Sequence, residues 1–495
     1  MGQALKPPTA LVIGAGIGGL TAGALLAKRG FGVDVYEQSA VAGGCASTFR
    51  RKGFIFEVGA TQVAGLEAGG IHYEIFRELD IPLPEASYCD PACVVYLPHE
   101  TEPIHVWRDR QRWQAERQRQ FPNSEPFWQF LEDLFGRSWG FQQRKPILPP
   151  RSLSDWWQLI QAIRWDTLPT FPYTFATVGD AVRGFGLGGD QRLWAFLDLQ
   201  LKLYSQVSAE ETALLYGATT LCLSQAPFGL YHLKGSMQVL SDRLLEALKK
   251  YGGRYHAMHR IEKIEVKQPP QVLVRNLRTR EAWWQPADEV IANVTVHNLC
   301  ELLGEQLPKG YHRKVASLPT PAGAFVVYLG VRAEAVPADC PPHLQFLDAY
   351  GESRSLFVSV SQAGDGRAPQ GYRTIIASEF TDPHLWAEVK DYPALKQFFT
   401  DRAVQQLGRF FRLEGNIVHV EAATPRTFAR YTQRWLGTVG GVGMRVHTFG
   451  LWGFANRLPV PHVWLVGDCT HPGEGTAGVS YSALTTVEHI CNGYQ

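Results

Sequence analysis

The chain has 495 residues, of which 45% are hydrophobic and 19% are charged, and its formal net charge is +1. This composition is typical of a globular protein with more than one hydrophobic core, organised in two or three domains. A net charge so close to zero argues against nucleic-acid binding, which calls for a strongly basic surface, but it does not argue against contact with a membrane.

The eight cysteines are scattered along the chain, and only Cys89 and Cys93 lie close together. A structural zinc site needs four convergent ligands, and no matching pair of cysteines or histidines accompanies these two. We therefore predict no metal site, and we expect reduced cysteines in a reducing compartment.

The stretch between Lys6 and Lys28 carries no charge and could pass for a signal anchor. It is rich in glycine, and no small-residue cleavage pattern follows it. We expect no cleaved signal peptide, no membrane-spanning helix and a location on the cytoplasmic side.

That stretch has the pattern of a dinucleotide-binding unit. A continuous apolar strand, "ALVIG", leads into a G-x-G-x-x-G motif made by Gly14, Gly16 and Gly19. A helical segment follows and ends at Gly30, and the next strand, "GVDVYE", ends at Glu37. Strand, glycines, helix, strand and acid occur in the order that this fold requires.

Each of these residues has a physical role in such a fold. Gly14 permits the tight turn, Gly16 lets the backbone approach a pyrophosphate, and Gly19 allows the helix to pack on the strand. Gly18 belongs to the same turn and is included among the predicted contacts. The helix N-terminus favours the phosphates, and Glu37 is expected to accept hydrogen bonds from ribose hydroxyls.

The sequence after Glu37 favours FAD over NAD. Gly43 and Gly44 lie just past the acidic strand end, and "GFIFEVGA" follows. This extension resembles the long N-terminal fingerprint of the flavin amine oxidase and phytoene desaturase superfamily, in which the double glycine lets the chain pass close to the flavin. Many members have arginine after the two glycines, where this chain has Cys45. Arg50 or Arg51 could supply the positive charge instead, or the two could be a solvated pair.

Tryptophan and arginine become frequent after Tyr88. The basic helical run "WRDRQRWQAERQRQF" is typical either of a solvated helix face or of a membrane interface. An amphipathic segment follows a Pro-Pro break, with a helix start predicted at Ser152 or Ser154. Its apolar residues suit the headgroup belt of a membrane and an ordinary core equally. They are Trp156, Trp157, Leu159, Ile160, Ile163 and Trp165.

Later segments resemble the return of the chain to the flavin domain. "GLYHLKGSMQVLSDRLLEAL" is similar to the hairpin and helix that make this return in the superfamily. The resemblance implies that the next strand contacts the adenine through Ile261. Another buried strand ends at Asn293. Sheet strands follow from about residue 314, and the glycine-rich "GTVGGVGMR" suggests a loop near the mouth of a pocket.

The segment "VWLVGDCTHPGEGTAG" resembles the strand and loop that close the flavin site in the same superfamily. The resemblance implies close approach of the backbone at Gly467 and a contact of Asp468 with a ribityl hydroxyl or the pyrophosphate. The first residues of the last helix would direct their N–H groups at the pyrimidine edge of the flavin. They are Gly475, Thr476, Ala477 and Gly478.

Within the superfamily the chain resembles the carotenoid desaturases and isomerases. "GATQVAGLEAGGIH", "CDPACVVYLP" and "SEPFWQ" are most similar to the cyanobacterial-type carotenoid 3′,4′-desaturases. The resemblance implies an FAD-dependent oxidoreductase that removes two hydrogens beside a polyene, with hydride transfer to the flavin. Glu474 and His471 adjoin the flavin loop and could move the second proton, or could simply hydrogen-bond the loop.

Three alternatives stay open. A redox-neutral carotenoid isomerase would use the same fold and FAD, an amine oxidase would release peroxide, and a carrier of prenylated proteins would do no redox chemistry. The partners implied by the desaturase reading are a carotenoid, a membrane surface contacted peripherally, and an electron acceptor such as a quinone or oxygen. The sequence gives no oligomeric state.

We predict an α/β and α+β protein whose Rossmann-like FAD-binding domain is built discontinuously. Residues 1–87, 227–300 and 450–495 are expected to form that domain. Residues 88–226 are predicted to be a helical substrate and membrane-contact insertion, and residues 301–449 a substrate-binding sheet domain.

Overall fold

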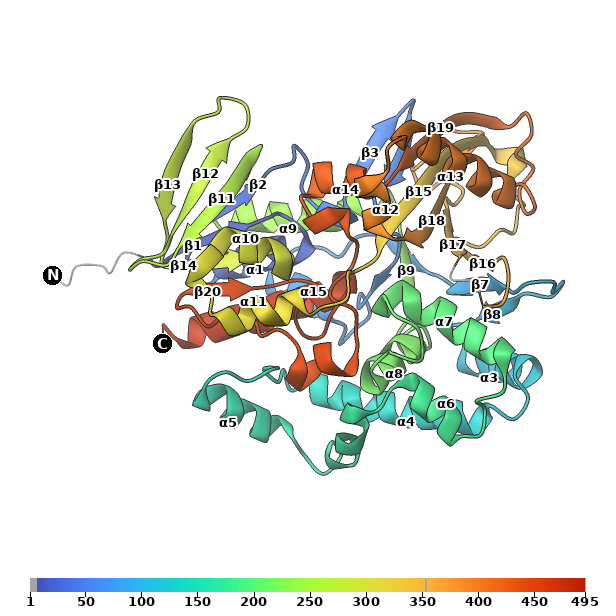
Figure 1. Cartoon of the computed structure of the whole chain (residues 1–495), viewed down its shortest axis with the longest axis horizontal. Helices are drawn as coiled ribbons and strands as arrows, with labels where there is room; N and C mark the ends of the chain where they lie inside the picture. Colours follow the sequence, from blue (N-terminus) through green and yellow to red (C-terminus); the bar gives the residue numbers. More distant parts are fainter. Residues whose placement is uncertain (1–6, 352–353, 495) are drawn as a thin grey trace.

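The computed structural model describes residues 7–351 and 354–494. Its central element is a five-stranded sheet in which every neighbouring pair of strands is parallel, in the order β10-β2-β1-β14-β20 (Figure 1). The strands are β1 (Thr9–Ile13), β2 (Gly32–Glu37), β10 (Arg254–Ala257), β14 (Glu289–Ala292) and β20 (Val463–Leu465). Three segments that are far apart in sequence therefore build one sheet.

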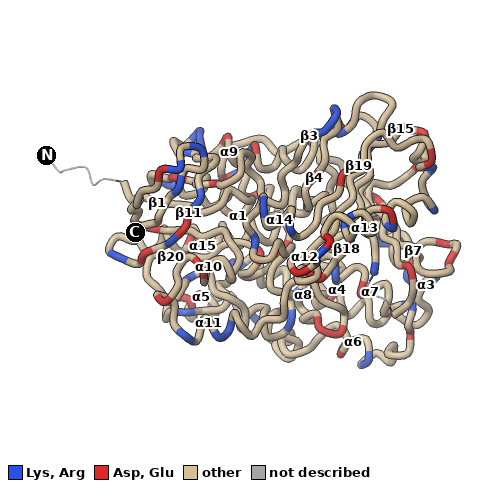
Figure 2. Tube along the Cα trace, turned by 45° about the horizontal axis from the view of Figure 1, so that its top comes forward, with Lys and Arg blue, Asp and Glu red and all other residues tan. Residues whose placement is uncertain are grey.

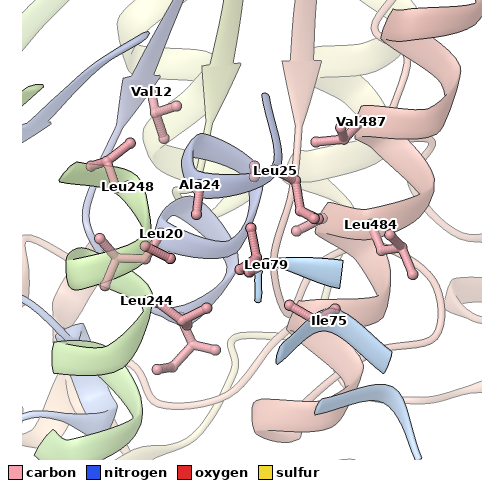
Figure 3. Close-up of a cluster of buried hydrophobic side chains, with 14 of the residues drawn as sticks. Val12, Leu20, Ala24, Leu25, Ile75, Leu79, Leu244, Leu248, Leu484 and Val487 are labelled. Atoms are coloured by element: carbon pink, nitrogen blue, oxygen red, sulfur yellow. The ribbon is translucent and has the colours of Figure 1, made fainter. Parts of the chain in front are cut away.

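Both faces of this sheet are covered, which explains why β1 is apolar throughout. One face packs on α1 (Ile17–Lys28), which lies between α9 (Gln238–Lys250) and α15 (Gly475–Asn492) (Figure 3). Val12 contributes to the core on this face, together with Leu20 and Leu25 of α1. The short α2 (Ile71–Glu78) adds Ile75 to the same core.

The other face of the central sheet packs on a second core that includes Leu11 and Ile13. It receives α10 (Val296–Leu303) and the antiparallel sheet β11-β12-β13. α11 (Lys309–Ala316) follows α10. The three strands are β11 (His259–Glu265), β12 (Gln271–Asn276) and β13 (Ala282–Pro286).

A mixed seven-stranded sheet forms the second region, in the order β19-β15-β18-β17-β16-β7-β8. Its strands are β7 (Cys93–Tyr96), β8 (Ile104–Val106), β15 (Gly323–Arg332), β16 (His343–Leu347), β17 (Ser355–Val360), β18 (Tyr372–Thr381) and β19 (Ile417–Ala423). The β16–β7 pair is parallel, and all other pairs are antiparallel. This region also carries α12 (Pro383–Glu388), α13 (Tyr392–Leu407) and α14 (Pro425–Thr432).

Two small β-structures connect these regions. The hairpin of β3 (Thr48–Arg51) and β4 (Phe54–Glu57) follows the double glycine. The strands β5 (Val63–Ala64) and β6 (Ala86–Tyr88) pair with β9 (Leu230–Leu233), which precedes α9.

The third region is a group of helices with its own core. Its helices are α3 (Arg110–Gln120), α4 (Glu125–Gln142), α5 (Leu153–Ala162), α6 (Val178–Gly184), α7 (Gln191–Ser205) and α8 (Leu214–Cys222). The predicted insertion 88–226 is not helical throughout, because β7 and β8 extend the mixed sheet. The division into three domains stays a proposal.

Most of the basic run in α3 is exposed, as expected of a solvated helix face, but Arg117 is an exception. Arg117 is 3% exposed and pairs with Glu125 at 3.1 Å and Glu132 at 2.6 Å, while Trp113 of the same helix is buried. One face of α3 is therefore part of the helical core. Basic and acidic residues are interspersed along the whole trace (Figure 2). Within residues 7–351 and 354–494, no helix combines the length and the apolar character needed to cross a membrane.

Candidate cofactor site

The turn between β1 and α1 is packed so tightly that only glycine fits. The Gly14 N–H donates to Tyr36 O at 2.8 Å, and Gly14 has a φ of +90°. A Cβ on Gly19 would lie 2.0 Å from Gly14 O, and a Cβ on Gly16 would lie 2.8 Å from Asn293 Nδ2. The turn is therefore packed closely against Asn293, and no side chain caps the N-terminus of α1 at Gly16, a terminus of the kind that favours an anion.

Glu37 holds this turn in place. Its carboxylate accepts the Ala15 N–H at 2.8 Å and the Ser39 N–H at 2.8 Å. Burial raises the pKa of Glu37, and the backbone hydrogen bonds oppose that rise. Each carboxylate oxygen can accept a second hydrogen bond, so the predicted contact with ribose hydroxyls remains compatible with this geometry.

The double glycine lies directly on the turn. The Gly43 N–H donates to Ala15 O at 2.8 Å, and Gly43 forms a β-bridge with Gly16. Gly43 and Gly44 both have positive φ values, +118° and +57°, which favour glycine. A Cβ on Gly44 would lie 3.4 Å from the Gly16 Cα. The structure thus brings the first and second predicted glycine motifs together.

The terminal loop meets the same turn from the other end of the chain. Gly467 has a φ of +118°, and a Cβ there would lie 3.0 Å from Asn293 Oδ1. A Cβ on Gly18 would meet Val479 O of α15 at 3.3 Å. A Cβ on Gly478 would lie 2.6 Å from Gly473 O. Gly475, Thr476 and Ala477 form the first turn of α15, so the N-termini of α1 and α15 meet at this site.

Two acids of the terminal loop have different surroundings. Asp468 Oδ2 forms an ion pair with Arg434 Nη2 at 2.9 Å. Glu474 Oε2 accepts a hydrogen bond from Gln206 Nε2 at 3.1 Å, and its buried Oε1 has no partner among the described residues. Burial and the negative charge of Asp468 raise the pKa of Glu474 well above its usual value. Burial therefore favours the protonated form of Glu474.

His471 is buried and neutral. Its Nε2 hydrogen-bonds the side-chain amide of Gln142 on α4, with distances of 2.8 Å and 3.0 Å to the two amide atoms. Burial lowers the pKa of His471 to about 3. Its Nδ1 is buried without a partner in the described part of the chain.

Other candidates from the sequence lie elsewhere. Ile261 packs in the second core with Ile264, whereas Ala257 of β10 is the residue in register with Glu37. The contact of Ile261 with adenine therefore stays a prediction. Arg51 is exposed and pairs with Glu421 of β19 at 3.1 Å.

Comparisons with known proteins show which proteins this chain is similar to. Residues 12–79 match the NAD(P)-binding Rossmann-like domain. Prolycopene isomerase 1, chloroplastic, from an Oncidium hybrid cultivar is 26% identical over 97% of this chain and 83% of its own. The 4,4′-diapophytoene desaturase (4,4′-diapolycopene-forming) of Methylomonas sp is 24% identical over 97% of this chain and 94% of its own. Over nearly its whole length the chain is therefore similar to carotenoid desaturases and isomerases.

Solved structures confirm the fold of this carotenoid desaturase and isomerase relative. Cyclohexylamine oxidase from Brevibacterium oxydans superimposes with a TM-score of 0.63 at 14% identity and covers 98% of this chain and 100% of its own. A putrescine oxidase variant gives a TM-score of 0.66 at 13% identity, with 98% and 99% covered. The predicted combination of a Rossmann-like domain and a mixed sheet is confirmed.

The residues of this desaturase and isomerase relative fit FAD. Two helix N-termini and glycines that exclude any Cβ form a cradle for a diphosphate. The double glycine and the terminal loop extend that cradle beyond what a simple NAD domain has, and FAD as cofactor is supported by the family. Sequence reasoning missed two residues here. Asn293 lies against four glycines of the turn, and Arg434 pairs with Asp468.

Proposed function

We propose that this chain is a carotenoid 3′,4′-desaturase that introduces a C=C bond into an acyclic carotenoid end group. It is an FAD-dependent oxidoreductase of the carotenoid desaturase and isomerase family. The observation that carries the proposal is the cradle made by both ends of the chain, in a protein that aligns with a desaturase over 97% of its length. The proposed electron acceptor is a quinone or oxygen.

Bound FAD supplies the acceptor for the hydride. The chain orients it through the N-termini of α1 and α15, whose N–H groups favour negative charge. The second hydrogen leaves the substrate as a proton and needs an acceptor. We assign this role to His471, because its buried Nδ1 has no partner among the described residues; the burial that lowers its pKa opposes this step, so His471 holds the proton only transiently.

A second candidate function is redox-neutral cis–trans isomerisation. It is favoured by the carboxyl group of Glu474, whose pKa burial raises, and by the prolycopene isomerases among the relatives. A carboxylic acid can donate a proton to one end of a double bond and recover it after rotation about the resulting single bond. This sequence leaves the composition of the carotenoid unchanged.

Product mass decides between the two. The FAD-loaded protein incubated with lipid-dispersed monocyclic carotenoid is expected to give a product that lacks two hydrogens and absorbs at longer wavelength. An unchanged mass with altered cis–trans geometry would instead establish isomerisation. Glu474→Gln, which keeps the size but removes the proton-donating acid, is expected to retain desaturation and to lose isomerisation.

We further propose that the protein docks peripherally on a membrane through α5 and the segment that follows it. Asp155, on the inner side of α5, is fully buried and pairs with His489 of α15 at 3.1 Å. The opposite side of α5 exposes Trp157 (62%), and Trp165 beyond the helix is 88% exposed. Leu159 and Ala162 are buried on the inner side together with Asp155, yet the outer side carries large aromatic residues, which an ordinary surface helix keeps out of water. Tryptophan in this position suits the headgroup region.

Replacing Trp156 and Trp157 together by Ser is expected to release the protein from liposomes. Burial of a large apolar side chain contributes roughly 1.5–3 kcal/mol, so the partition coefficient should fall by about 10-fold or more. Flotation with phosphatidylcholine and phosphatidylglycerol vesicles measures it. Trp283 and Trp284 on β13 are a matched exposed pair, and their replacement by Ser should leave partition unchanged. Equal partition of wild type and the Trp156/Trp157 variant would refute the docking surface.

A further inference from the structure

Arg434 is a largely buried cation that the cofactor motifs do not include. Its side chain is 16% exposed, and its Nε donates to Thr438 O at 2.8 Å. Its Nη2 contacts Asp468 Oδ2 at 2.9 Å and also donates to Gly440 O. Its Nη1 makes no hydrogen bond to any residue that the structure describes. A buried guanidinium calls for compensation of its charge and of its donors, and one edge of this fork is free for an anion.

Arg434 lies close to the glycine turn. Its ion-pair partner Asp468 directly follows Gly467, which contacts Asn293 above the turn. The positive charge of Arg434 also opposes the burial that raises the pKa of the Cys45 thiol. Cys45 comes directly after Gly44, which packs on the Gly16 Cα. Arg434 therefore lies beside the part of the cradle that suits a diphosphate.

Residues 431–441, here called the crossing segment, carry Arg434 into this position. At one end, Tyr431 O accepts hydrogen bonds from Gln38 Nε2 at 3.0 Å and Ser39 Oγ at 2.7 Å, next to Glu37. At the other end, a Cβ on Gly441 would lie 2.2 Å from Asp468 O. The crossing segment thus reaches from the end of β2 to the loop after β20.

The middle of the crossing segment is fixed by α10. The Trp435 ring stacks on His297 with ring centroids 4.0 Å apart, and the backbone N–H of Trp435 donates to Asn298 Oδ1 at 3.1 Å. Gly437 has a φ of +69°, and a Cβ there would lie 1.8 Å from Pro425 O. These contacts leave the backbone around Arg434 little freedom, so its guanidinium is held in place before a ligand arrives.

We propose that Arg434 binds the diphosphate of FAD and that the crossing segment, rather than either glycine motif, supplies this charge. This inference rests on the proposed function only in taking FAD as the cofactor. Asp468 alone would place a carboxylate beside a dianionic ligand, and Arg434 offsets that repulsion. The two glycine motifs themselves carry no basic side chain at this point, since Cys45 follows the double glycine.

Arg434→Met is expected to weaken binding of both FAD and ADP by roughly 10- to 100-fold, the loss typical of a hydrogen bond to a charged group. Quenching of flavin fluorescence measures the FAD affinity, and calorimetric titration measures the ADP affinity, which reports the diphosphate without the flavin. Arg434→Lys keeps the charge and should recover part of the loss. Unchanged affinities for FAD and ADP in Arg434→Met would overturn the proposal.

The double variant Arg434→Met/Asp468→Asn separates diphosphate binding from a purely structural role. If Arg434 only neutralises Asp468, the double variant binds FAD as tightly as the single variant Asp468→Asn, which would also overturn the proposal. If Arg434 contacts the diphosphate, the double variant stays weak. Arg430→Met, at an exposed position on α14, is the matched control and should bind FAD normally. These assays contain no carotenoid, so a wild type that binds FAD without converting carotenoid refutes the proposed function alone.

Discussion

Replacement of Gly19 by alanine is expected to abolish useful FAD binding. The added Cβ would lie 2.0 Å from Gly14 O and 3.1 Å from Asn293 Nδ2, and the first of these atoms is backbone that cannot swing aside. Either α1 moves away from β1 or the turn opens, and both disrupt the diphosphate cradle. Overpacking costs about 1–3 kcal/mol where neighbours can adjust and more where they cannot, which predicts a loss in FAD affinity of roughly 100-fold or more.

A glycine in another helix is the control that shows whether the loss of FAD affinity is specific to the turn. Gly136 lies in α4 with open space around its Cβ position. Gly136→Ala should therefore leave FAD affinity unchanged and raise the free energy of unfolding by up to about 1 kcal/mol, the difference in helix propensity. Flavin fluorescence titration and urea unfolding measure the two quantities. Wild-type FAD affinity in Gly19→Ala would mean that the turn is not the cofactor cradle.

The second large effect, a loss of unfolding free energy, is expected on replacement of Arg367. This residue lies in a buried charge cluster between β4 and β9. Arg367 is 2% exposed and contacts Glu57 at 3.1 Å, Asp365 at 3.7 Å and Leu233 O at 2.9 Å. Arg367→Met leaves two buried carboxylates without their cation. Removal of one partner of a buried ion pair typically costs about 3–5 kcal/mol, and urea unfolding should show a loss of this size.

The loss of unfolding free energy in Arg367→Met should depend on pH. Burial raises the pKa of Glu57 to about 7, and Arg367 opposes that rise. Because the folded-state pKa lies above that of the unfolded chain, Glu57 contributes stability that is complete below pH 4.5 and is lost as pH rises through 7. Without Arg367, Glu57 loses more of its stabilising contribution as the pH rises. The difference in unfolding free energy between Arg367→Met and the wild type should therefore grow from pH 5 to pH 8.

An exposed ion pair provides the comparison for Arg367. Lys234 pairs with Glu85 at 2.7 Å, and both side chains are mostly exposed. Lys234→Met should have no measurable effect on unfolding at either pH, because solvent screens such pairs. A deficit of Arg367→Met that is equally small would show that the buried cluster contributes nothing to stability.

The parts of the site that the sequence predicted well are those fixed by local sterics. Gly14 and Gly19 must be glycine because a turn of this geometry has no room for a Cβ, and that requirement is visible as a spacing. The prediction that this turn meets the terminal loop rests on the resemblance to the flavin amine oxidase and phytoene desaturase superfamily. No local pattern in the sequence links Gly467 to β1, near the other end of the chain. The contact through Asn293 that joins them was not foreseen.

The features that could not be predicted from the sequence depend on contacts between distant segments. Arg434 stands in an unremarkable polar stretch, and only the crossing segment brings it to Asp468. The basic run in α3 looked solvated or interfacial, yet Arg117 is buried because Glu125 and Glu132 of α4 neutralise it. The amphipathic pattern of α5 fitted a core or an interface, and the contact of Asp155 with His489 determines which side faces the protein.

The parallel sheet has a consequence for biogenesis. β20 and α15 lie within residues 463–492, yet they pair with β14 and pack on α1, whose residues leave the ribosome hundreds of codons earlier. Contacts of such high sequence separation form slowly. The apolar surfaces of α1 and β14 therefore stay without these partners until β20 and α15 have been synthesised, and on the proposed site we expect FAD to bind only after that point. Association with a chaperone during synthesis, and stabilisation of the finished chain by free FAD, follow from this order of events.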